Sequence, residues 1–128
     1  MSLGFVPSFW TYRYVKLWGY DLLGHRAVPL IAAIQKFERE RGGPPLTLTK
    51  LVPDFLPTIP KTGMAAYPDY EYAPEPGPCP NDNRWHVRVG AEEVFKWDFF
   101  FYCPKQNYGE DGWGGYNEVR GDWAYLHE

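Results

Sequence analysis

The chain has 128 residues, a formal net charge of −3, and 8 Phe, 10 Tyr and 6 Trp. This length suits one domain and rules out a second of full size, while 45% hydrophobic residues argue against disorder. Because 13 Lys and Arg stand against 16 Asp and Glu, no bulk positive field exists to support non-specific binding of nucleic acid.

The first 26 residues are rich in aromatic side chains at helical spacing. Trp and Tyr are typical of the membrane–water interface, so we expect residues 1–26 to be either a membrane-proximal helical segment or a packed N-terminal helix. No signal peptide is recognisable, and the longest apolar stretch, residues 27–34, is shorter than the ~20 residues of a membrane span. We therefore expect membrane attachment only through a segment that is not in this sequence.

Residues 27–43 are predicted to form the main helix. Apolar positions follow the i, i+3, i+4, i+7 spacing of a helix with one buried stripe, and Pro29 is expected to bend it. Gly42 accepts the left-handed conformation that ends a helix, and Pro44 prevents continuation. The predicted buried stripe is Ala27, Leu30, Ile31, Ile34 and Phe37.

Residues 44–66 contain several prolines, and we expect this segment, the strap, to be extended. A short helix at 48–52, capped by Thr47, is predicted within it. The strap would connect the helix to residues 67–128, where the apolar period changes to two.

A period of two predicts a sheet in the last part of the chain. Phe100 and Tyr102 alternate with Phe99 and Phe101, so this strand is expected to be central and covered on both faces. A helix followed by strands predicts one α+β domain, in which an N-terminal amphipathic helix packs on a small antiparallel sheet of about four strands. The predicted strands lie at about 70–72, 85–89, 95–101 and 123–127, and the predicted loops at 74–83, 90–93 and 108–122.

The two cysteines, Cys79 and Cys103, each precede a proline, which favours a strand edge or turn for both. They are too few and too far apart for a zinc site. We predict a disulfide between them, with two buried free thiols as the alternative. A disulfide implies an oxidising, extracytoplasmic compartment.

The loop at 108–122 holds the candidate ligand-binding residues. Tyr108, Trp113 and Tyr116 could form a platform that stacks on sugar rings or on an apolar partner. The alternative is that these rings fold back over the core.

Calcium is the candidate metal, because the loops offer hard oxygen ligands and glycines that let carbonyls converge. The candidate calcium ligands are Glu110, Asp111, Glu118 and Asp122, in the loop at 108–122. The segment Asn81-Asp82-Asn83 is a second candidate site. For both sites the alternative is ordinary Asx turns.

Catalytic motifs are missing from the sequence, so we expect a protein that is not an enzyme. It contains no nucleophile elbow, phosphate-binding loop or dinucleotide fingerprint, and no cofactor other than calcium is expected. Of three widely separated histidines, His86 is expected at a solvated strand position. The least favoured alternative is a small hydrolytic or metal-dependent enzyme that uses His86 or His127 with nearby carboxylates.

Residues 27–73 resemble a known family. The helix ends Ile34-Gln35-Lys36-Phe37-Glu38-Arg39-Glu40-Arg41-Gly42-Gly43-Pro44-Pro45, and Thr47-Leu48, Leu51-Val52-Pro53, Phe55-Leu56-Pro57, Ile59-Pro60 and Tyr70-Glu71-Tyr72 follow. This order resembles the soluble part of pseudopilin-like proteins, most closely the major pseudopilins of type II secretion systems.

The resemblance implies a long helix against a small antiparallel sheet, a place in the bacterial envelope, and partners among other envelope proteins or copies of the chain. Family members also carry a calcium loop near the C-terminus. They are processed at a Gly-Phe junction, but after Gly4-Phe5 the chain has Phe9 where the family has glutamate. The processing motif is therefore absent, and filament assembly is left open.

We accordingly expect a non-catalytic domain of pseudopilin-like type, in the periplasm or at the cell surface, that acts through protein–protein contacts. In the full-length protein it would be membrane-anchored. The alternative is a secreted ligand-binding module, with carbohydrate as the candidate ligand of the loop around Trp113.

Overall fold

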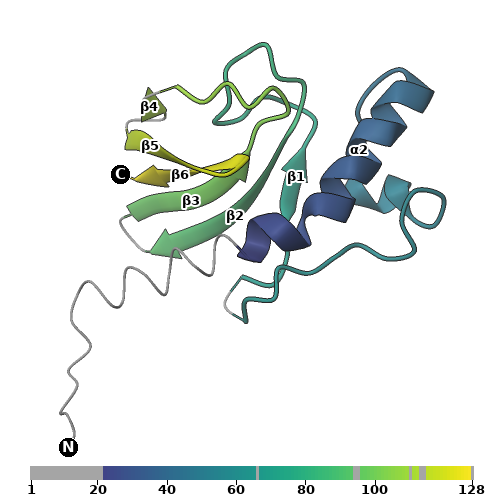
Figure 1. Ribbon diagram of the computed structural model, residues 1–128, viewed down its shortest axis with the longest axis horizontal. Coiled ribbons are helices and arrows are strands. Elements are labelled where there is room, and N and C mark those ends of the chain that lie inside the picture. Colours follow the sequence, from purple (N-terminus) through teal and green to yellow (C-terminus); the bar gives the residue numbers. More distant parts are fainter. Residues whose placement is uncertain (1–21, 66, 94–95, 110, 113–114, 128) are drawn as a thin grey trace, which may run out of the picture.

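The fold is a helix laid against one face of an antiparallel sheet (Figure 1). The computed structural model describes residues 22–65, 67–93, 96–109, 111–112 and 115–127, and for 91–93, 96–99, 111–112, 115–116 and 127 it describes the backbone alone. Most of the predicted N-terminal segment 1–26 therefore lies outside the described residues. The predicted α+β class is confirmed.

Helix α2 runs over Val28–Arg41 and confirms the predicted main helix. Residues 22–26 are also helical, and a turn at Ala27 separates them from α2. The break thus comes at Ala27, with Pro29 in the first turn of α2, where a proline has no N–H to donate to the preceding turn. Gly42 ends the helix in the left-handed conformation, with φ 82°.

The strap packs on the C-terminal half of α2. Its 3-10 helix η1 covers Leu48–Leu51, and Phe55 beyond it lies 5.2 Å from Phe37 of α2, centroid to centroid. The predicted capping bond from Thr47 is wrong: its hydroxyl pairs with the Thr49 hydroxyl at 2.8 Å and caps no backbone N–H.

Among the described residues, six strands form the sheet in the order β1-β2-β3-β6-β5-β4, and every neighbouring pair is antiparallel. The predicted strands correspond to β1, β2, β3 and β6. The bounds are β1 Glu71–Ala73, β2 His86–Glu93, β3 Lys96–Tyr102, β4 Asp111–Gly112, β5 Gly115–Arg120 and β6 Trp123–His127.

Two predicted loops are wrong in part. Residues 90–93 belong to β2, where they pair with β3, and the segment 108–122 contains β4 and β5. Asn117, Glu118 and Arg120 interrupt the apolar alternation that marks a strand, yet their backbone pairs with β6. Cross-strand pairing therefore outweighs the weak local pattern here.

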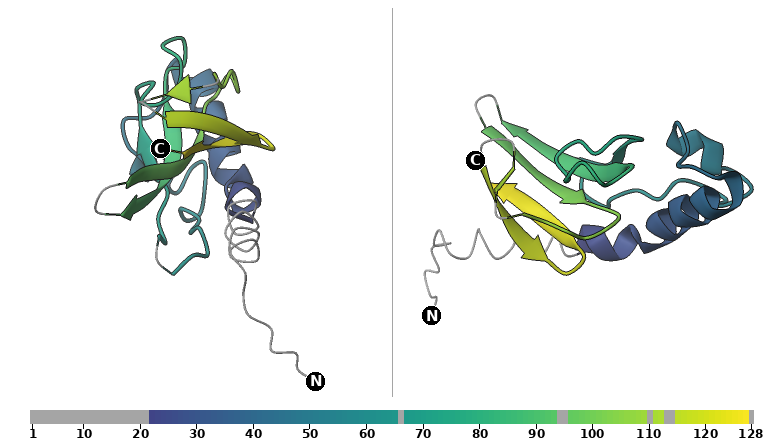
Figure 2. Two further views of the ribbon diagram at one scale, coloured as in Figure 1. Left: turned by 90° about the vertical axis from the view of Figure 1, so that its left-hand side faces the viewer. Right: turned by 90° about the horizontal axis from the view of Figure 1, so that it is seen from above.

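Central strand β3 separates two clusters of buried side chains, as its alternation predicts. Phe100 and Tyr102 face α2, whereas Phe101 faces the other side. Figure 2 shows α2 on one face of the sheet. The first cluster includes Leu23, Leu30, Ile34, Trp85, Val87, Val89, Phe100, Tyr102, Trp123 and Tyr125. The second is Cys79, Phe101, Cys103, Ala124 and Leu126.

Polar bonds also join the helical region to the sheet. Trp85 Nε1 donates to Glu38 Oε1 at 3.2 Å, and the Tyr70 hydroxyl donates to the Leu23 carbonyl oxygen at 2.7 Å. One bond joins the residue before β2 to α2, and the other joins the residue before β1 to the helical segment that precedes α2. Within the described part of the chain, no helix has both the length and the apolar character needed to cross a membrane.

Candidate functional site

A groove of about 780 Å³ lies between the start of α2 and the turn that joins β5 to β6. Figure 2 shows this turn beside the beginning of the helix. Side chains of the helical region form one wall, the β5–β6 turn forms the other, and aromatic rings of β3 and β6 form the floor. We call this feature the helix–turn groove.

The helix wall of the groove is mixed: Val28 and Ala32 are apolar and exposed, whereas His25 and Gln35 are polar. Val28, Ala32 and Gln35 follow one another at helical spacing, so they share one side of α2. Val28 is 60% exposed, whereas Ile31 beside it is 8% exposed. Val28 and Ala32 therefore face the groove rather than the core.

The floor of the groove is a packed set of aromatic rings. The Trp123 ring stacks on Phe100 with centroids 4.9 Å apart and an interplanar angle of 11°. It also lies 5.6 Å from the Tyr102 ring. All three residues are at most 4% exposed, so mutual packing fixes the floor in place.

One polar atom of this floor, Nε1 of Trp123, has no hydrogen-bond partner among the described residues. Gly24 lies against the Trp123 indole, since a Cβ at that glycine would be 3.5 Å from Nε1. No hydrogen bond joins Nε1 to any residue that the structure describes. Nε1 is not among the buried side-chain atoms that lack a partner, so this donor is open to water in the groove.

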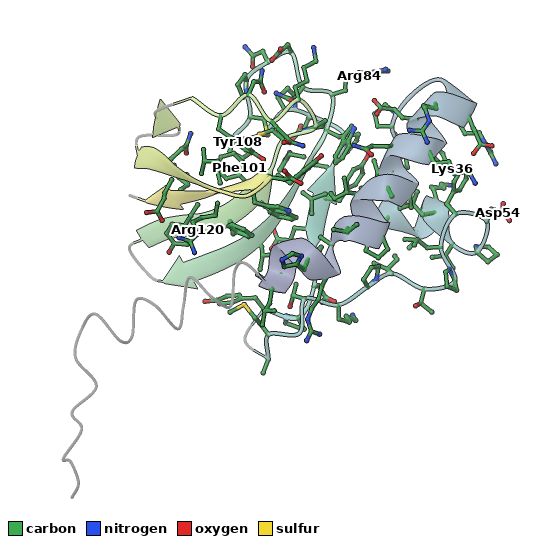
Figure 3. The ribbon with its side chains drawn as sticks, viewed as in Figure 1. Lys36, Asp54, Arg84, Phe101, Tyr108 and Arg120 are labelled. Atoms are coloured by element: carbon green, nitrogen blue, oxygen red, sulfur yellow. A yellow bond between two sulfur atoms is a disulfide. The ribbon has the colours of Figure 1, made fainter. Side chains whose placement is uncertain are left out.

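The remaining border of the groove is polar. Arg120, at the end of β5 (Figure 3), and Asp122 border the groove on the sheet side. Tyr102 and Gln106 also line the groove, and burial raises the pKa of Tyr102. It therefore stays a neutral group at physiological pH. An apolar wall beside a few fixed hydrogen-bonding groups is the usual make-up of a binding site.

The predicted platform residue Tyr108 lies elsewhere, in the second cluster. Its ring meets Phe101 edge to face, with centroids 5.5 Å apart. The two residues are labelled next to each other in Figure 3. Its hydroxyl donates to the Asp122 carbonyl oxygen and accepts from the Cys103 N–H at 3.0 Å. Burial raises the pKa of Tyr108. These contacts give Tyr108 a structural role.

For the other two platform residues, the ligand-binding role stays a prediction. Trp113 lies outside the described residues, and so does the side chain of Tyr116 in β5. Of the three platform residues, the structure describes the side chain of Tyr108 alone.

The candidate calcium ligands are only partly described. Glu110 and the side chain of Asp111 lie outside the described residues. Glu118 pairs with Tyr125 within the sheet, whereas Asp122 lies in the turn before β6. Across the described residues, no three His, Cys, Asp or Glu side chains group closely enough to hold a metal ion.

The second candidate, Asn81-Asp82-Asn83, is held by side-chain hydrogen bonds. Asn107 Nδ2 donates to the Asp82 carboxylate at 2.9 Å, and the Lys105 ammonium lies 3.5 Å from it. The Asn107 bond lowers the pKa of Asp82. Asn83 accepts from the Lys105 N–H at 2.9 Å. This network fits the alternative of ordinary turn chemistry, because the protein's own donors occupy the carboxylate.

The prediction that His86 is solvated is wrong. Its side chain is 4% exposed, and Nδ1 donates to the Glu75 carbonyl oxygen at 2.9 Å. The loop between β1 and β2 covers the ring, with Gly77 directly against it. Burial lowers the pKa of His86. The His127 side chain lies outside the described residues.

Cys79 and Cys103 form the predicted disulfide, with their Cα atoms 5.7 Å apart. It joins the loop before β2 to the end of β3, within the second cluster. The bond indicates that the protein occupies an oxidising compartment.

Sequence reasoning missed the helix–turn groove. The signal was the spacing of Val28, Ala32 and Gln35 on the side of the helix next to the predicted stripe. A single exposed valine carries little information in a sequence, since many apolar side chains are exposed in soluble proteins. The opposite wall depends on the β5–β6 turn, which the sequence pattern did not reveal.

Comparison with known proteins adds no assignment: no family model matches the chain, and neither a curated protein nor a solved structure shows significant similarity to it.

Proposed function

We propose that this domain acts in the cell envelope through protein–protein contacts, without catalysis, as a pseudopilin-like module. The observation that carries the contact part is the helix–turn groove, where Val28 is 60% exposed and the Trp123 N–H has no partner among the described residues. An exposed apolar wall beside a fixed polar group is typical of a surface that binds another molecule.

Two further observations support the envelope part of this proposal. The order of a helix, a proline-rich strap and an antiparallel sheet agrees with what the resemblance implies. The disulfide between Cys79 and Cys103 fits an extracytoplasmic location such as the periplasm or cell surface. Membrane anchoring belongs to the same proposal.

The experiment uses the native host. Cells are treated with a thiol-alkylating reagent before lysis and then fractionated. In one strain a photo-cross-linking residue replaces Val28, and in a second strain it replaces Leu46, another exposed apolar residue. We expect an oxidised protein in the envelope fraction and a defined cross-linked protein band from at least one position. Reduced thiols in the cytoplasmic fraction would overturn the envelope assignment, and a lack of cross-links from both positions would overturn the contact role.

A further inference from the structure

We propose that His86 is a pH-sensitive latch for the loop between β1 and β2. When its ring gains a proton, residues 74–77 lift from the sheet, while the disulfide to Cys103 holds Cys79 in place. This inference goes beyond the proposed function and does not depend on it, because it concerns a movement within the domain.

The latch is a single hydrogen bond. His86 is the first residue of β2, is 4% exposed, and donates from Nδ1 to the Glu75 carbonyl oxygen at 2.9 Å. Among the described residues, no other hydrogen bond joins residues 74–78 to the sheet. Gly77 lies directly against the ring, since a Cβ at that glycine would be 2.3 Å from Cε1. The start of the loop therefore depends on the His86 ring for its hydrogen bonding to the sheet.

Prolines make the start of the loop stiff and poor in hydrogen bonds of its own. Single residues, Glu75 and Gly77, separate Pro74, Pro76 and Pro78. Each proline fixes its own φ, restricts the residue before it, and has no N–H to donate. Pro74 and Glu75 are exposed, so little packing opposes their movement. The segment can therefore leave the sheet as one piece that turns about Gly77, whose φ is +57°.

The second half of the loop is held more firmly. Cys79 is 5% exposed and is bonded to Cys103. Asn83 is 2% exposed, donates from Nδ2 to Asn107 Oδ1 at 2.9 Å, and accepts from the Lys105 N–H at 2.9 Å. These contacts confine the opening to the residues before the disulfide.

A proton on His86 makes the closed position less favourable. Burial is the main cause, because a charged ring loses hydration there, and it lowers the pKa of His86 from the ordinary value of 6.5. Arg88, two residues along β2 and so on the same face, also disfavours a second positive charge. The Glu75 carbonyl and the carboxylates of Glu71 and Glu75 favour the charged ring but do not outweigh these effects. Once residues 74–77 lift, water reaches the ring and it can keep its proton, so acid favours the open loop.

The test is amide hydrogen exchange, measured by NMR on the intact, oxidised protein at pH 7.5 and pH 5.5 and corrected for the intrinsic pH dependence of exchange. The reporting amide is that of Cys79, which donates to the Pro76 carbonyl oxygen at 2.9 Å and so depends on the position of the moving segment. Its protection should fall about two- to tenfold at pH 5.5, where tenfold is the limit for an open-state ring with the ordinary pKa of 6.5.

The matched control amide is that of Asn83, in the firmly held half of the same loop. It donates to the Pro80 carbonyl oxygen at 3.0 Å. Because this turn lies beyond the disulfide, its amide should lose little protection over the same pH range.

The variant His86→Asn separates the ring from other titrating groups. Its amide N–H₂ can donate to the Glu75 carbonyl oxygen without titrating, so the Cys79 amide should have the same protection at both pH values. Should this variant fold poorly, a pH titration of the wild type replaces it. Protection of the Cys79 amide should begin to fall near pH 6.5 and level off where the imidazole resonances of folded His86 titrate.

Three results would overturn the latch: unchanged protection of the Cys79 amide between the two pH values, equal loss at Cys79 and Asn83, or the same loss in His86→Asn as in the wild type. Equal loss at the two amides would mean that protonation destabilises the whole domain rather than the start of the loop. None of these measurements involves a partner, so their outcome is independent of the cellular cross-linking result.

Discussion

At the level of single residues, His86 links protonation to stability. Its ring is buried in the folded protein, and burial lowers its pKa from the ordinary value of 6.5. Arg88 acts in the same direction, whereas the Glu75 carbonyl and the Glu71 and Glu75 carboxylates oppose it. The unfolded chain therefore takes up a proton at higher pH than the folded protein. Stability from the neutral ring is complete above about pH 6.5 and is lost as the pH falls through the folded-state pKa.

This linkage is tested with His86→Asn, whose amide N–H₂ can replace the Nδ1 donor without titrating. We expect the free energy of unfolding, measured in urea at pH 7.5 and at pH 5, to fall more in the wild type than in the variant. Carboxylates contribute to both proteins equally, so the difference belongs to His86. Equal decreases in the two proteins would contradict the assignment.

Gly77 is required for the burial of that ring. Its φ is +57°, and a Cβ at this position would lie 2.3 Å from His86 Cε1. Gly42 has φ +82° with no atom within 4 Å of an added Cβ, so Gly42→Ala is the matched control. Both alanine variants should lose about 1–2 kcal/mol from the left-handed backbone. Gly77→Ala should lose clearly more in urea unfolding, and equal losses would show that the ring contact is unimportant.

At the level of elements, the disulfide joins the loop before β2 to the end of β3, 24 residues apart in sequence. In the chain-entropy model, a disulfide that closes a loop of this size stabilises the folded protein by about 3.5 kcal/mol. The double variant Cys79→Ala, Cys103→Ala should lose about that amount, measured by urea unfolding. Reductant should lower the stability of the wild type and leave the double variant unchanged. A wild type insensitive to reductant, under conditions where its thiols become free, would contradict the expectation.

Elements differed in how well the sequence predicted them. Helix α2 was predictable because its spacing, its proline and Gly42 are local signals. Strands β2, β3 and β6 were predictable because large apolar side chains alternate along them. Strand β5 was missed, since its position depends on pairing with β6 rather than on its own side chains.

At the level of the whole molecule, the class of fold was predictable and the site was not. The sequence indicated which side chains are apolar, but the helix–turn groove arises where α2 passes the β5–β6 turn, far away in sequence. The burial of His86 was likewise hidden, because it depends on a loop that folds back over β2. Contacts between distant segments leave no local pattern, and both features are of that kind.

The two clusters share strand β3, which makes the molecule one cooperative unit. Phe100 belongs to the first cluster and Phe101 to the second, each 1% exposed, so neither cluster can open without moving the strand that carries the other. Near-ultraviolet and far-ultraviolet circular dichroism should therefore report the same urea midpoint. Phe100→Leu and Phe101→Leu should each lower that common midpoint, by on the order of 1 kcal/mol in free energy. Two separate midpoints, with each variant shifting one of them, would mean that the faces of the sheet unfold independently.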